Sequence, residues 1–111
     1  MFIVDDKCYS WSSTSHGRGK RSEIVGAGVY VIEHIATGKY LVGLSKTVSN
    51  EVDKHIAALR NNSHQNKAML GLVHRDMDLR LLEYPISKVS DQKALIAKIR
   101  ATTEPKYLML N

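Results

Sequence analysis

Cysteine, proline and long apolar runs are scarce in this chain of 111 residues, which has one cysteine and two prolines. A single cysteine leaves no partner for an intrachain disulfide, which fits a reducing compartment. No stretch approaches the roughly 20 apolar residues that a membrane helix needs. The first residues carry Asp5 and Asp6 and lack the basic-then-apolar order of a signal peptide. We therefore expect a cytoplasmic protein that does not contact membranes.

Acidic residues are fewer than basic ones: the chain has 11 Asp and Glu residues and 16 Lys and Arg residues, which gives a net charge of +5. A basic domain of this size often binds nucleic acid, since Lys and Arg release condensed counterions when they neutralise phosphates. The alternative is that the charge only aids solubility. The length predicts one domain, with enough residues to bury a single core.

The first 25 residues differ in composition from the rest. Phe2-Ile3-Val4 predicts a short strand, and the polar stretch from Ser10 to Ser22 is typical of a loop or arm. This arm has two interpretations, a nucleic-acid-binding segment or a solvated loop. The basic residues that would make contact in the first case are Arg18, Lys20 and Arg21.

Residues 26–111 show the alternation of a mixed domain. Runs rich in β-branched and aromatic residues at 26–35 and 39–44, joined by Ala36-Thr37-Gly38, predict a β-hairpin. A helix follows from about Asn50 to Asn61, with an apolar face made by residues spaced at a helical period: Val52, Ile56 and Leu59.

The remaining elements follow the same logic. We expect a helix from His64 to His74 with Ala68, Met69, Leu72 and Val73 inward, and a strand from Leu79 to Tyr84. Ser90 is a suitable N-cap for a helix that reaches about Thr102, and a short strand could cover 107–110. The order β-β-α-α-β-α predicts an α+β domain.

Short motifs along this region resemble the GIY-YIG nuclease superfamily. Gly28-Val29-Tyr30 resembles the GIY triplet, and Leu41-Val42-Gly43 stands where the YIG triplet belongs. The pattern H-x3-L-x4-H-x-N-x3-L, which follows YIG in phage homing endonucleases, is similar to His55, Leu59, His64, Asn66 and Leu70. Leu81-Leu82-Glu83 and Pro105-Lys106-Tyr107 resemble later segments. The resemblance implies a small three-stranded antiparallel sheet flanked by helices.

The resemblance also implies metal-dependent hydrolysis of DNA, and several of the required groups do not match. Such chemistry uses a metal-binding glutamate, an arginine near the phosphate and tyrosines that position water. Tyr30 matches the first tyrosine. The second falls on Leu41, with Tyr40 one residue early and therefore on the opposite face of a strand. The arginine position falls on Glu51, and the glutamate position on about Ala97.

Tyr30 and His55 are therefore the candidate catalytic positions. They are either remnants of a phosphate pocket or polar residues that pack where the sheet meets a helix. If the correspondence holds, Tyr30, Glu51 and Ala97 should converge on one concave face. Arg60 lies more than two helical turns beyond Glu51 and should not replace the missing arginine. The histidines lack the i, i+4 spacing of a helical metal pair, so we expect no metal site.

The sequence thus favours a DNA-binding protein that is derived from a GIY-YIG endonuclease, has lost cleavage and needs no cofactor. The expected nucleic-acid contacts are Arg18, Lys20, Arg21, Lys46, Lys54, Arg60, Lys67 and Arg75. One alternative is an active nuclease that uses Mg²⁺ with Glu83 or Glu104 as a relocated ligand. Another is a protein-binding module that inhibits a nuclease.

Overall fold

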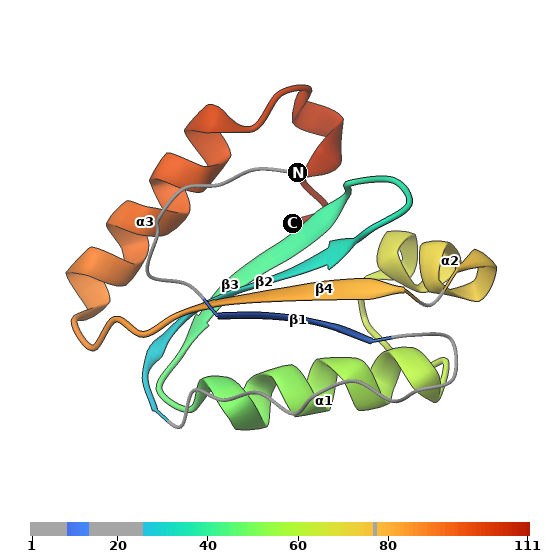
Figure 1. The fold of residues 1–111 in the computed structure, drawn as a ribbon, viewed down its shortest axis with the longest axis horizontal. Coiled ribbons are helices and arrows are strands. Elements are labelled where there is room, and N and C mark those ends of the chain that lie inside the picture. The colour runs from blue at the N-terminus through green and yellow to red at the C-terminus, as the bar shows by residue number, and fades with distance from the viewer. Residues whose placement is uncertain (1–8, 14–25, 77) are drawn as a thin grey trace.

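In the described part of the chain, four strands form an antiparallel sheet that is the middle layer of the fold (Figure 1). The computed structural model describes residues 9–13, 26–76 and 78–111. The strands are β1 (Tyr9–Ser13), β2 (Gly28–His34), β3 (Tyr40–Ser45) and β4 (Leu79–Tyr84), in the order β1-β4-β2-β3. The expected hairpin (β2 and β3) and third strand (β4) are confirmed, and these three strands form the predicted antiparallel sheet of an α+β domain, to which β1 adds a fourth strand.

The additional strand β1 corrects one expectation. It pairs with β4 at the edge of the sheet, with Trp11 opposite Leu81. Assigning Ser10–Ser13 to a polar loop was therefore wrong, because backbone pairing with an open edge outweighs the low strand propensity of serine. The predicted strand at Phe2–Val4 and the rest of the arm lie outside the described residues.

Helices cover both faces of the sheet (Figure 1). α1 (Val48–Arg60) and α2 (Lys67–Arg75) share one core with Tyr30, Ile32 and Leu41, whereas α3 (Val89–Thr102) shares a second core with Val29, Val31 and Tyr40. This division follows from the strand period of two, which sends alternate side chains to opposite faces. No helix in the described part of the chain is long and apolar enough to cross a membrane.

The apolar face of α1 matches the prediction, since Val52, Ile56 and Leu59 are buried, together with Val48. α2 begins later than expected, at Lys67. The Asn66 side chain accepts a hydrogen bond from the Met69 backbone N–H and so caps the helix. This start turns Ala68 outward, contrary to the prediction, and the buried residues of α2 are Met69, Leu70 and Val73.

The C-terminal segment attaches to the outer edge of β3. A short 3₁₀ helix (Lys106–Leu108) stands where a strand was predicted, and only Met109 makes a β-bridge, with Tyr40. The Asn111 side-chain amide accepts a hydrogen bond from the Val42 N–H and donates one to the Val42 carbonyl. These contacts satisfy backbone groups that an edge strand would otherwise leave unpaired.

Candidate functional site

The first candidate residue, Tyr30, points from β2 toward α1. Leu41 lies on the same face of the sheet, and Tyr40 lies on the other. Thr103 donates its hydroxyl proton to the Ile99 carbonyl, so the Tyr40 hydroxyl donates to Thr103 at 2.6 Å. The expectation that Tyr40 lies on the opposite face of the strand from position 41 is confirmed.

Glycines of both triplets are required by close packing. Tyr30 and Gly43 are directly opposed on β2 and β3, and a Cβ atom at Gly43 would overlap the Tyr30 ring and hydroxyl. A Cβ atom at Gly28 would overlap the carbonyl of Tyr84 on β4. Gly28, the first residue of the first triplet, therefore allows close packing of β2 against β4. Gly43, the last residue of the second triplet, leaves room for the Tyr30 ring to lie across β3.

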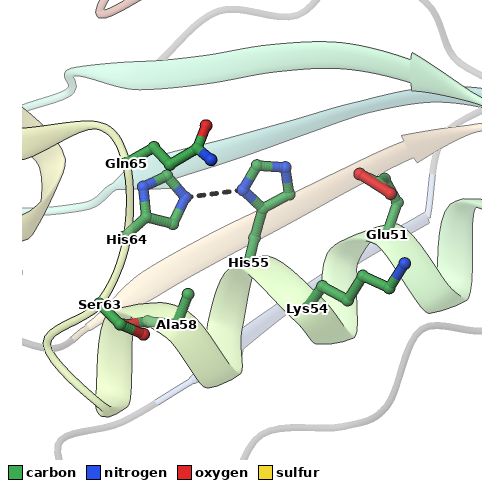
Figure 2. A pocket seen from close by; sticks show the side chains of 7 residues that line it. All are labelled: Glu51, Lys54, His55, Ala58, Ser63, His64 and Gln65. Atoms are coloured by element: carbon green, nitrogen blue, oxygen red, sulfur yellow. Dashed lines mark hydrogen bonds between the residues drawn. The ribbon is translucent and has the colours of Figure 1, made fainter.

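A line of hydrogen bonds connects β2 to the segment between α1 and α2. The Tyr30 hydroxyl is 2.9 Å from Nε2 of His55, on α1. His55 Nδ1 is 2.7 Å from His64 Nε2, and this contact is drawn in Figure 2. The Asn66 backbone N–H donates to His64 Nδ1 at 2.9 Å. Three residues that the resemblance singled out separately, Tyr30, His55 and His64, therefore form one connected group.

The direction of every bond in this line follows from the backbone donor at its end. Because His64 Nδ1 accepts, a neutral His64 carries its proton on Nε2 and donates to His55 Nδ1. His55 in turn carries its proton on Nε2 and donates to the Tyr30 oxygen. The Tyr30 hydroxyl proton is then available as a donor.

Burial sets the charge state of the group. Desolvation lowers the pKa of both His55 and His64, and the neighbouring His64 lowers that of His55 further while Glu51 partly offsets this. Burial, with a smaller contribution from Glu51, raises the pKa of Tyr30 to about 12. At neutral pH the line is therefore uncharged, with a protonated tyrosine at one end.

An open hollow of about 290 Å³ lies beside this line, between α1 and the segment that follows it (Figure 2). Glu51, Lys54 and His55 border it from α1, and Ser63, His64 and Gln65 border it from the connecting segment. Glu51 supplies negative charge at the position where the resemblance expects arginine. A phosphate here would meet one carboxylate and one ammonium, so the hollow is not a strong phosphate site.

Ala97 does not belong to this group. It lies on α3, which packs on the face of the sheet opposite to Tyr30 and Glu51, and its side chain is exposed. The predicted convergence of the three positions is therefore wrong. The correspondence of Ala97 to the metal-binding glutamate is refuted with it, so Ala97 is no evidence for a lost metal ligand, and the resemblance depends on Tyr30, His55 and His64 instead. The error arose from carrying a helix position across by order in the chain, which does not determine the face on which that helix packs.

The carboxylates considered for an active nuclease are also poorly placed. Glu83 lies opposite Tyr30 on β4, but its side chain is completely buried, so it cannot share a metal ion with a DNA phosphate. Glu104 follows the C-terminal end of α3. Among residues 26–76 and 78–111, no three His, Cys, Asp or Glu side chains are grouped closely enough to hold a metal ion.

The predicted DNA contacts separate into several places. Lys67 and Arg75 border a second hollow over α2, and they are joined there by Lys39, which is not among the contacts predicted from the sequence. Lys54 borders the first hollow, whereas Lys46 and Arg60 are exposed elsewhere. Arg18, Lys20 and Arg21 lie outside the described residues. Lys39 was missed because it lies in the hairpin turn, far in sequence from α2.

Comparisons of the chain with models of protein families, with curated proteins and with solved structures find no match. The resemblance to GIY-YIG nucleases is therefore a hypothesis that depends on the residues and contacts described above.

Proposed function

We propose that this chain is a DNA-binding protein derived from a GIY-YIG endonuclease, and that it does not cleave DNA. The hydrogen-bonded line Tyr30–His55–His64 is the observation that carries the proposal. It joins the first triplet to the two histidines of the motif that follows, and Tyr30 packs on the glycine of the second triplet. Independent chance matches in sequence have no reason to meet in one contact network.

Positive charge supports the choice of DNA as ligand. The net charge is +5, and Lys39, Lys67 and Arg75 gather around one hollow. Such groups give sequence-independent affinity through counterion release and can position a duplex. We also propose that the protein is located in the cytoplasm, where it would meet DNA or a DNA-bound factor.

Chemistry at the first hollow supports the absence of cleavage. Glu51 is close enough to contribute to the raised pKa of Tyr30 and to offset part of the lowering of the His55 pKa, and it would oppose the charge that develops on a phosphate during hydrolysis. The second tyrosine position is occupied by Leu41, which is buried in the core. Removal of a single charge-stabilising group typically costs about 10²- to 10³-fold in rate.

A gel shift and a nicking assay on the same supercoiled DNA, each with and without Mg²⁺, test the proposal together. We expect a shift in both conditions and no nicks in either. Nicking that needs Mg²⁺ and disappears in Tyr30→Phe would instead support the active nuclease. Absence of any shift would refute DNA binding and leave the protein-binding module as the function to test.

A further inference from the structure

The second hollow combines three cations from two distant parts of the fold. Its volume is about 330 Å³, and it lies between α2, the β2–β3 turn and the C-terminal segment. Lys67 and Arg75 come from the two ends of α2, and Lys39 comes from the turn. Leu72 and Leu110 supply apolar lining, and no acidic side chain is among the described residues that border the hollow.

The contacts around this hollow hold its walls in place. The Asn66 side chain, which caps α2, also donates to the Leu110 carbonyl, and the Leu110 N–H donates to the Tyr40 carbonyl on β3. The wall made by the C-terminal segment is thereby joined both to the start of α2 and to the sheet. The Lys39 ammonium lies 5.8 Å from the centre of the Tyr107 ring, a cation–π contact with the C-terminal segment.

Three like charges around one hollow repel one another unless an anion lies between them. The first hollow differs, because Glu51 balances Lys54 there. A tetrahedral phosphate oxyanion suits the second hollow in charge, since its oxygens can accept hydrogen bonds from both ammonium and guanidinium groups.

We propose that Lys39, Lys67 and Arg75 bind one backbone phosphate of DNA in the hollow over α2, and that this is the anchoring contact of the protein on DNA. The identity of the ligand rests on the function proposed above. This proposal adds Lys39 to the DNA-binding residues. Lys46 and Arg60 do not contact the anchoring phosphate.

Gly71 offers a direct test, because it borders the hollow and a Cβ atom there meets nothing within 4 Å. Gly71→Glu places a carboxylate among the three cations, and Gly71→Gln adds a neutral side chain of the same size. Both replacements favour helix over glycine, so both variants should fold. Binding to a short labelled DNA duplex should weaken about ten- to a hundredfold in Gly71→Glu relative to Gly71→Gln, as expected for loss of charge-assisted hydrogen bonds.

A charge-matched pair of triple variants tests whether the three cations share one phosphate. The first variant replaces the three cations of the hollow with alanine: Lys39, Lys67 and Arg75. The second variant replaces three exposed cations of α3 with alanine: Lys93, Lys98 and Arg100. One shared phosphate predicts that the slope of log affinity against log salt becomes less negative by about 0.9 in the first variant. Three separate phosphates predict about 2.7. The α3 variant should keep the slope of the wild type.

The outcomes separate this inference from the proposed function. If the wild-type chain does not bind the duplex, DNA binding itself is refuted. If the wild type binds and Gly71→Glu binds as tightly as Gly71→Gln, the hollow is not the contact, and DNA binding stands. A slope change near 2.7, or the same change in both triple variants, overturns the shared phosphate.

Discussion

Acidification should loosen the contact between α1 and the segment that follows it, because His55 and His64 can keep their hydrogen bonds only when neutral. A second proton on His64 would occupy Nδ1 and face the Asn66 N–H, and a second proton on His55 would face His64 Nε2–H. Each lost hydrogen bond contributes about 0.5–1.5 kcal/mol, so the two together represent about 1–3 kcal/mol of the free energy of unfolding.

The direction of the effect follows from the lowered pKa of both histidines in the folded state. As the pH falls below the ordinary histidine pKa of about 6.5, the unfolded chain takes up protons before the folded chain does. The stabilising contribution is therefore present above this pH and is lost as the pH falls through the lower, folded-state pKa values. Within that window, stability should change by up to roughly 1.4 kcal/mol per pH unit for each proton.

Urea unfolding measured at a series of pH values checks this expectation. His64→Gln removes one titrating ring from the line and should flatten the dependence, whereas His74→Gln removes an exposed histidine of α2 and serves as the matched control. Nitrogen chemical shifts should show the rings of both His55 and His64 protonated on Nε2 at neutral pH. Stability that stays constant or rises on acidification through this window, or a pH slope unchanged in His64→Gln, would contradict the hydrogen-bond directions inferred here.

Three further outcomes follow from the structure. Gly43→Ala should lower the free energy of unfolding by about 1–3 kcal/mol, because the added methyl group overpacks against Tyr30. In urea unfolding, most of this loss should disappear when Gly43→Ala is made in a Tyr30→Val background. Equal losses in the two backgrounds would refute the packing argument. Tyr40→Phe should cost about 0.5–1.5 kcal/mol by removing the bond to Thr103, while the His55 ring resonances stay unchanged because the two residues lie on opposite faces. Combining Glu51→Arg, Leu41→Tyr and Ala97→Glu should produce no Mg²⁺-dependent nicking, since position 97 lies across the sheet; metal-dependent cutting by this variant would reopen the correspondence.

Much of the architecture was predictable from local pattern. The strand bounds Leu79–Tyr84, the hairpin and the inner face of α1 were expected because a period of two or of 3.6 residues in apolar side chains reports which face is buried. The opposite placement of Tyr40 and Leu41 followed from the same strand period. The start of α2 was predicted too early: Asn66 caps the helix through its side-chain oxygen, and its side-chain nitrogen donates to the distant Leu110 carbonyl, a contact that only the tertiary structure reveals.

By itself, the sequence determined the α+β class, the basic charge and the opposite facing of Tyr40 and Leu41, since these depend on composition and on neighbours close in the chain. Tertiary structure alone decided that His55 meets His64 and that Lys39 joins Lys67 and Arg75. It also placed Ala97 away from Tyr30. The physical reason is the same in each case: which face of the sheet a helix covers, and which turn lies beside it, depends on packing between segments far apart in sequence.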